Sequence, residues 1–549
     1  MLKSAVTNHT ASTIVPNPWF ILFVSLFIIG ALYEFWRRST REYKLMKNIP
    51  TFREIPIIGH GHLAIGLDTV EVGLKLIEAM EKLGETVRGN LFHIMVVVIT
   101  NPRDIELFLS AHKHLEKSEE YNYFQPWFGD GLLISKGHHW RHHRKMIAPT
   151  FHQSILKSFI PTFVKHSKTV CNRLNATIGQ EFDAHKYMSE TTVNILLTTV
   201  MGVKEEPETE NSAKYAQAVM DMCQIIHNRQ YRPLYRLDVT YKWTDMYQKG
   251  EELLDIILVS TRKLIRQRKI GFNANERAVK DKSYDLLLSK SEFPTVKSVG
   301  LRDDLDEIDE NDVGEKKRLA LLDSMLEMEN NPNIEWTDKD INDEVNTIMF
   351  EGHDTIAAGS SFVLCLFGIH RDIQEKVYAE QKSIFGNNML RDCTFGDTLR
   401  MNYLERVICE TFRLYPPVPA IARKVEEDTK LVSGPYTIAK GTTVLIPQYF
   451  IHRRADIYPE PDKFDPDRFL PEHASKRHYY SFIPFSAGPR SCVGRKYAML
   501  QLKVLLSTII RTFRIHSSRS EKDFLLQPDI ILKLANGFNI SVEPRGQGK

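Results

Sequence analysis

The stretch Phe485–Gly494 carries the side chain best suited to chemistry, Cys492, within Phe-Ser-Ala-Gly-Pro-Arg-Ser-Cys-Val-Gly. Gly488 and Pro489 favour a tight loop, and Gly494 lets the backbone approach a flat group closely. A helical pattern follows, and a cysteine just before a helix has its thiolate form favoured by the helix dipole. Such a thiolate can be the axial ligand of a haem iron. The spacing favours haem ligation over the alternative, a buried cysteine in a Gly/Pro turn.

A second stretch with residues suited to chemistry is predicted to be a helix over Glu344–Leu366. Three polar residues and an alanine would share one face of it: Glu351, Asp354, Thr355 and Ala358. Gly352 weakens the helix where the Thr355 hydroxyl could turn to a backbone carbonyl and open a groove. An acid–alcohol pair can relay protons to bound dioxygen, so Asp354 and Thr355 are the candidate catalytic residues. The alternative is a kinked polar helix without chemistry.

The segment Gly137–Arg144 is rich in histidine. His138/His142 and His139/His143 are both spaced i,i+4, a spacing that can bind a metal ion. The alternative is a helix that places Trp140 and Arg144 against an anionic group and leaves the histidines on a solvated face.

Composition limits the class of protein. The chain has 549 residues, of which 42% are hydrophobic and 26% charged, so it can bury a large core. The net charge of +3 gives no indication of a nucleic-acid partner. Six scattered cysteines without a Cys-x-x-Cys pair exclude a disulfide framework and favour a reducing compartment.

The N-terminal region is predicted to anchor the chain in a membrane. Trp19–Trp36 contains a single charged residue, Glu34, and a helix of this length spans roughly 27 Å. Five basic residues follow it, whereas only Lys3 precedes it, which predicts a lumenal tail over 1–18 and a cytosolic remainder. The basic stretch 37–50 is then a linker to a domain over 51–549. A cleaved signal peptide is the alternative. Asn8–Thr10 is a glycosylation sequon on the lumenal side.

Helical periodicity dominates from Asp68, and Leu91–Thr100 is predicted to form strands of a small sheet. Helical segments continue from Ser154 to about Lys269. The stretch Phe272–Glu315 lacks apolar periodicity and is expected to be a flexible insertion. Seven acidic residues lie within Asp303–Asp312, so a docking surface for a basic partner is the functional alternative.

The pattern Phe485-x-x-Gly488-x-Arg490-x-Cys492-x-Gly494 resembles the haem-binding signature of the cytochrome P450 monooxygenases. The resemblance implies the P450 fold, which is mainly α with a small β region, behind a single N-terminal transmembrane helix. It implies haem b held by Cys492, with electrons from NADPH through a separate reductase. Arg495 and Lys496 are candidate contacts for that reductase.

The resemblance also assigns roles to residues elsewhere. It implies that four residues meet the haem propionates: Trp140, Arg144, Arg423 and Arg490. It implies a buried ionic network behind the cysteine, made by Glu410, Arg413 and Arg468. Phe485 and Gly488 belong to the cofactor loop. A substrate pocket would be lined by Phe124, Trp127, Met349, Phe350, Ala358, Val418 and Ile421.

Within that family the chain is similar to the fourth family, in which the position of Glu351 can form an ester with a haem methyl group. Ile356 departs from the usual pattern, which has a second hydroxyl residue there, so Thr355 is the only alcohol at this point. The acidic insertion Leu301–Gly314 and the run Gly488–Leu500 resemble the insect G subfamily.

That subfamily is associated with oxidative decarbonylation of long-chain aldehydes to cuticular hydrocarbons. The implied location is the endoplasmic reticulum membrane. Fatty-acid ω-hydroxylation and the metabolism of insecticides or hormones are alternatives within the enzyme class. A haem isomerase and a non-catalytic haem-binding protein are alternatives from other classes.

Overall fold

The computed structural model describes residues 17–546 except 65, 69, 72–74, 76–81, 92–93, 112, 204–208 and 280–318. The sequon Asn8–Thr10 and the acidic run Asp303–Asp312 lie outside the described residues.

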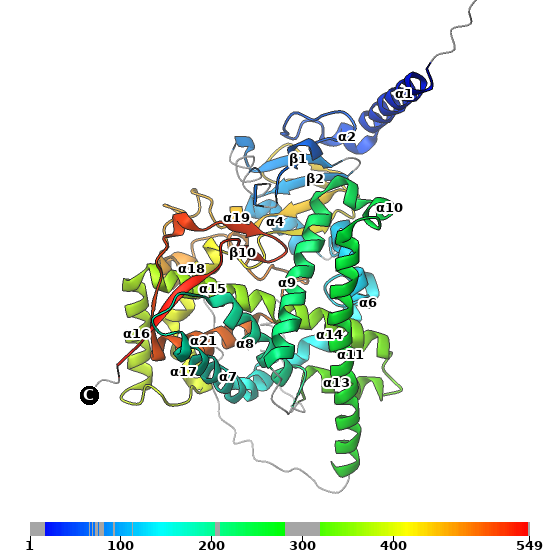
Figure 1. Ribbon diagram of the computed structural model, residues 1–549. Helices are drawn as coiled ribbons and strands as arrows, with labels where there is room; N and C mark the ends of the chain where they lie inside the picture. The colour runs from blue at the N-terminus through cyan, green and yellow to red at the C-terminus, as the bar shows by residue number, and fades with distance from the viewer. Residues whose placement is uncertain are drawn as a thin grey trace, which may run out of the picture.

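The chain is mainly helical, as predicted, with a small β content, and strands β1 (Thr86–Leu91) and β2 (Ile94–Ile99) lie near the N-terminal helix α1 (Pro18–Ser39) (Figure 1). The first half contains the helices α1 (Pro18–Ser39), α2 (Arg41–Met46), α4 (Pro102–Leu109), α5 (Gln125–Phe128), α6 (Gly137–Ile147), α7 (Gln153–Leu174), α8 (Ala184–Thr199), α9 (Thr209–Tyr231), α10 (Asp238–Tyr241) and α11 (Asp245–Val279). The second half contains α13 (Leu321–Glu329), α14 (Asp338–Glu351), α15 (Asp354–Ile369), α16 (Arg371–Phe385), α17 (Phe395–Arg400), α18 (Asn402–Leu414), α19 (Gln448–Ile451), α20 (Pro471–Ala474) and α21 (Arg495–Thr512).

The strands are β1 (Thr86–Leu91), β2 (Ile94–Ile99), β3 (Phe182–Asp183), β4 (Ile421–Lys424), β5 (Thr429–Lys430), β6 (Thr437–Ile438), β7 (Thr443–Ile446), β8 (Phe513–His516), β9 (Leu526–Pro528), β10 (Leu532–Leu534) and β11 (Asn539–Pro544). The largest sheet has the order β1-β2-β7-β4, in which only β2 and β7 are parallel. Its apolar face is buried, and Val97 and Val444 have no exposed surface. The sheet fixes Arg423, which lies opposite Val444 on the edge strand β4.

Among the described residues two stretches have the length and composition of a membrane span, Pro18–Ser39 and Asp338–Ile369, and burial distinguishes them. In the central stretch 83% of an 18-residue apolar window is buried, whereas in the N-terminal helix only 6% of such a window is buried. The stretch Asp338–Ile369 therefore belongs to the core of the globular part, since α15 packs on α8 and α18. Helix α1 projects from the body beside β1 and β2 (Figure 1), and its apolar side chains are exposed.

Two boundaries differ from the predictions. The stretch 37–50 packs on the globular part, because its basic residues find acidic partners there: Arg37 pairs with Glu54 and Arg41 with Asp428. Met46 is fully buried against the sheet, so the segment 37–50 is part of the packed domain and not the separate linker expected from the sequence. The other difference is α11, which continues to Val279 and enters the stretch expected to be irregular.

Candidate functional site

The loop that carries Cys492 is fixed by its own backbone. The Cys492 N–H donates to the Phe485 carbonyl at 2.9 Å, and the Ser491 N–H donates to the Gly488 carbonyl at 2.8 Å. Helix α21 then begins directly after Gly494, as the sequence predicted. Cys492 is exposed although its neighbours Ser491 and Val493 are buried. The loop therefore presents the cysteine away from the packed protein.

Gly488 is required at this loop for two reasons. Its φ of +68° is a conformation that other residues rarely adopt, and a Cβ added there would lie 1.8 Å from the Leu109 carbonyl oxygen. Gly386, at the end of α16, has nearly the same φ of +62° but nothing within 4 Å of an added Cβ.

We predict that Gly488→Ala destabilises the protein more than Gly386→Ala does. Both substitutions add backbone strain of about 1–2 kcal/mol. The collision with Leu109 should add about 1–3 kcal/mol at Gly488 alone. Chemical denaturation of the two variants measures the difference, and equal destabilisation would contradict the prediction.

Three buried cations lie around the cysteine loop. Lys117, Arg423 and Arg490 are 7%, 1% and 8% exposed. Arg490 lies over the Trp140 ring at 4.3 Å from the ring centre, and its guanidinium donates to the carbonyl oxygens of Leu115, Leu132 and Ser135. Together with Arg144, which lies one helical turn after Trp140 on α6, they form what we call the cation cluster.

The positive charges of the cation cluster repel one another. Burial, with Arg423 and Arg144 nearby, lowers the pKa of Arg490 to about 9. Burial, with Arg423 and Arg490 nearby, lowers the pKa of Lys117 well below its usual value. Buried like charges are costly unless an anion neutralises them.

The cation cluster fits a haem. Burial lowers the pKa of Arg423, and its Nη2 has no hydrogen-bond partner among the described residues. A flat group with two carboxylates would neutralise these cations and accept from such a guanidinium. Both Cys492 and Glu351 lie close enough to Lys117 to influence its pKa, so the cysteine lies near the cation cluster. Lys117 was not found from the sequence, because it lies in no recognisable motif.

Glu351 ends α14 and is half-buried. Burial raises the pKa of its carboxyl to about 7; Lys117 opposes this rise, as do Arg144 and Arg490 more weakly. The carboxyl thus lies near three members of the cation cluster.

Asp354 lies in different surroundings. Its Oδ2 accepts from the Lys533 ammonium at 2.9 Å, and its Oδ1 lies 3.8 Å from His185 Nε2. Burial alone would raise the pKa of Asp354, but Lys533, His353 and His185 outweigh burial and lower it. The expected continuous helix is interrupted here, since α14 ends at Glu351 and α15 begins at Asp354. Glu351 and Asp354 therefore do not share one set of neighbours.

Thr355 behaves as the sequence predicted. Its hydroxyl donates to the Glu351 carbonyl at 2.8 Å, across the interruption between α14 and α15. The neighbouring Gly352 leaves little room for a side chain, because an added Cβ would lie 2.8 Å from Leu196. Ala358 is fully buried on α15.

Behind the loop, Glu410 and Arg413 form a fully buried ion pair on α18. The Arg413 guanidinium also donates to the carbonyl oxygens of His452, Pro461 and Lys463. Arg468 lies 3.5 Å from Glu410 and donates to the Glu460 carbonyl. Phe485 contacts the same helix through Phe412, at 5.9 Å between ring centres.

The candidate pocket residues divide into two groups. Phe350 contacts both Phe124 and Trp127, with ring centres 6.2 Å and 5.2 Å away. Met349 is buried beside them on α14. Val418 packs against both hydrophobic cores, and Ile421 belongs to the core under the sheet.

Two surface interpretations are wrong. The histidines of α6 do not all lie on a solvated face, because His143 is 2% exposed and contacts Glu344. Arg495 is 5% exposed, since α21 is buried on most sides, and it cannot be an exposed docking contact.

Comparison with known proteins identifies the family. A family model described as Cytochrome P450 matches residues 49–542. The chain is 60% identical over 544 residues to Cytochrome P450 4g1 of Drosophila melanogaster, covering 99% of this chain and 97% of that protein. It is 46% identical to Cytochrome P450 4g15 of the same organism, covering 93% and 95%. It is 34% identical to Cytochrome P450 4V2 of Homo sapiens, covering 92% and 91%.

The fold also matches a solved structure. The crystal structure of the cytochrome P450DA heme domain superposes with a TM-score of 0.70 at 18% identity, covering 91% of this chain and 98% of that one. At this identity the match supports the fold alone.

Proposed function

The chain belongs to the cytochrome P450 family and is a haem-thiolate monooxygenase of the fourth, insect-type group similar to the G subfamily. From this premise we propose that it cleaves long-chain aldehydes oxidatively to hydrocarbons one carbon shorter. The similarity to two G-type relatives along nearly the whole chain carries the proposal.

The protein side of the mechanism follows from the site. A haem held by Cys492 supplies the dioxygen chemistry. The cation cluster would hold its propionates, with Trp140 covering Arg490. Loop Phe485–Gly494 keeps Cys492 in place, and Gly488 lets that loop pass Leu109.

Asp354 and Thr355 are proposed to move protons. Lys533 keeps Asp354 ionised, and Asp354 Oδ1 has no hydrogen-bond partner among the described residues. The Thr355 hydroxyl donates to the Glu351 carbonyl, so its lone pairs are left to accept a hydrogen bond from water. Asp354 and Thr355 are adjacent at the start of α15, and a neighbouring acid and alcohol can pass protons in sequence.

The membrane and the electron donor complete the proposal. We propose that Trp19–Trp36, within α1, spans the endoplasmic reticulum membrane with the tail 1–18 in the lumen and the domain 51–549 in the cytosol. Electrons come from NADPH through a reductase, and the half-buried Lys496 remains the candidate contact. The long-chain substrate would enter beside the aromatic group of Phe124, Trp127 and Phe350.

The reaction products distinguish the proposed decarbonylation from the alternative activities. Full-length protein with reductase, NADPH and a long-chain aldehyde is expected to give a hydrocarbon one carbon shorter. Formation of an ω-hydroxylated product without any shortened hydrocarbon would contradict decarbonylation and favour the fatty-acid hydroxylase. Turnover only of insecticides or hormones would favour the third alternative.

We further propose that Glu351 forms an ester with a haem methyl group, as the resemblance implies. Acid extraction should then release less haem from wild type than from Glu351→Ala and Glu351→Gln. Gln keeps the size of Glu351 but lacks a carboxylate, so it separates the ester from simple packing. Extraction of equal amounts of haem from all three proteins would contradict the proposed ester.

A further inference from the structure

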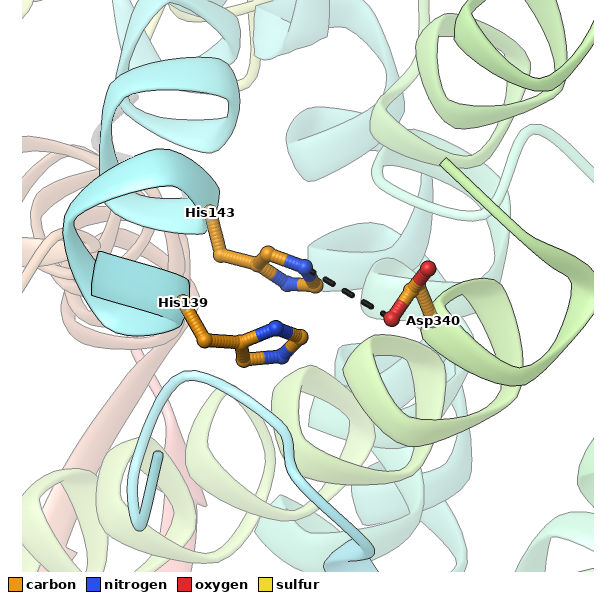
Figure 2. A group of neighbouring side chains, drawn as sticks. All are labelled: His139, His143 and Asp340. Atoms are coloured by element: carbon orange, nitrogen blue, oxygen red, sulfur yellow. Dashed lines mark ion pairs between the residues drawn. The ribbon is translucent and has the colours of Figure 1, made fainter. Parts of the chain in front are cut away.

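Away from the cysteine loop, the fold brings His139, His143 and Asp340 together. The two histidines lie one turn apart on α6, and Asp340 lies in the first turn of α14. One potential ligand atom from each residue lies within 4.8 Å of the other two. Figure 2 shows the two imidazole rings extending from one helix toward the carboxylate on the other. Residues far apart in the sequence thus offer two nitrogens and one oxygen to one point.

His143 is oriented by its surroundings. Its Nδ1 lies 2.7 Å from a carboxylate oxygen of Glu344, which is fully buried and also accepts from the Leu132 N–H. The Trp336 ring stacks on the imidazole at 4.4 Å. Since a carboxylate only accepts, Nδ1 carries the proton, and Nε2 is the atom that faces Asp340 at 3.6 Å. A carboxylate behind a histidine in this way is typical of metal-ligating histidines.

In His139 and Asp340, too, one polar atom is engaged in hydrogen bonds and another is left as a possible metal ligand. His139 Nε2 lies 3.2 Å from the Asp130 carbonyl oxygen, to which it can donate, so Nδ1 is left as a ligand atom. Asp340 Oδ2 accepts from the backbone and hydroxyl of Thr337 in a capping box, while Oδ1 faces His143. Each side chain is therefore held by one atom and presents another.

We propose that His139, His143 and Asp340 bind a divalent transition-metal ion, and that zinc fits this donor set. Two imidazoles and one carboxylate suit zinc, and water would complete the coordination. Zinc–ligand distances of about 2.0–2.2 Å place tetrahedral ligand atoms roughly 3.4 Å apart, so the site contracts on binding. His139 is half-buried and the Asp340 side chain is 14% exposed, so the ion enters from solvent.

The position of the site gives it a structural consequence. The ion would join α6, which carries Trp140 and Arg144, to α14, which ends at Glu351. Both helices carry residues of the proposed haem site. Zinc binding therefore stabilises the arrangement of the haem-binding residues without contacting the haem.

A second histidine pair on α6 provides a matched control for the proposed zinc site. His138 and His142 form a second i,i+4 pair on α6, with ring centres 6.4 Å apart. Among the described residues no acidic side chain joins that pair to make a group of three. A substitution in either pair removes one histidine from the same helix, but only one pair has the third ligand.

Calorimetric titration of zinc chloride into the full-length, haem-loaded protein, after chelator treatment, tests the proposal. We expect one zinc per chain, with affinity at least ~10-fold lower in His139→Gln and in Asp340→Asn and unchanged in His138→Gln. The haem absorption spectrum of each variant shows that it is folded. Absence of stoichiometric zinc overturns the proposal. So does zinc binding that His139→Gln leaves unchanged, or that His138→Gln weakens equally.

Discussion

Arg413→Ala is expected to yield protein that takes up no haem. Arg413 has no exposed surface, and its guanidinium contacts both oxygens of Glu410. It also donates to three carbonyl oxygens in the segment that leads to the cysteine loop, those of His452, Pro461 and Lys463. Removing one partner of a buried ion pair costs about 3–5 kcal/mol, because the other charge stays buried. The segment behind Cys492 would lose its attachment to α18.

The haem-to-protein ratio of the purified variant measures this effect. Arg406→Ala is the matched control, since Arg406 lies on the same helix and pairs with the half-exposed Asp467 at 3.0 Å. A surface pair of this kind contributes about 0–1 kcal/mol, so the control should bind haem normally. Normal haem uptake by Arg413→Ala would refute the role given to the network. Glu410→Ala should behave like Arg413→Ala.

The second large effect is expected from Lys533→Met, which leaves Asp354 buried without its cation. Asp354 is fully buried, and the Lys533 ammonium is its closest charged partner at 2.9 Å. The loss should be about 3–5 kcal/mol near neutral pH. Asp354→Asn combined with Lys533→Met removes both charges and should recover part of the stability.

The pH dependence has a definite sign. In wild type the pKa of Asp354 is lowered, so its contribution is present above the unfolded carboxyl pKa and is lost as pH falls through the lowered value. In Lys533→Met burial should raise that pKa, and the variant should instead lose stability as pH rises toward neutral. Melting temperatures between pH 4 and 8, by circular dichroism, measure both curves. Parallel curves for wild type and the variant would contradict the role of Lys533.

Local patterns in the sequence predicted the parts of the site that depend on short spacings. The turn residues around Cys492 and the helix after Gly494 both appear in the structure. Glu410 and Arg413 are three residues apart on one helix, so their contact follows from helical geometry. Thr355 turns to the Glu351 carbonyl for the same local reason.

Long-range packing decided what the sequence could not show. Lys533 reaches Asp354 across 179 residues, and no spacing rule connects a strand near the C-terminus with α15. Lys117 and Glu344 likewise gain their roles from burial beside distant elements. The two histidine pairs of α6 have identical spacing, and only the packing of α14 and Trp336 distinguishes them.

The central claim is that the loop Phe485–Gly494 holds a haem through the thiolate of Cys492. The absorption spectrum of the reduced, carbon monoxide-bound protein tests it most directly, because the Soret band reports the axial ligand. Wild type should show the thiolate-type band, and Cys492→Ser should lose that band even where some haem remains bound. A thiolate-type band that survives in Cys492→Ser, or that is missing from folded, haem-loaded wild type, would contradict the claim.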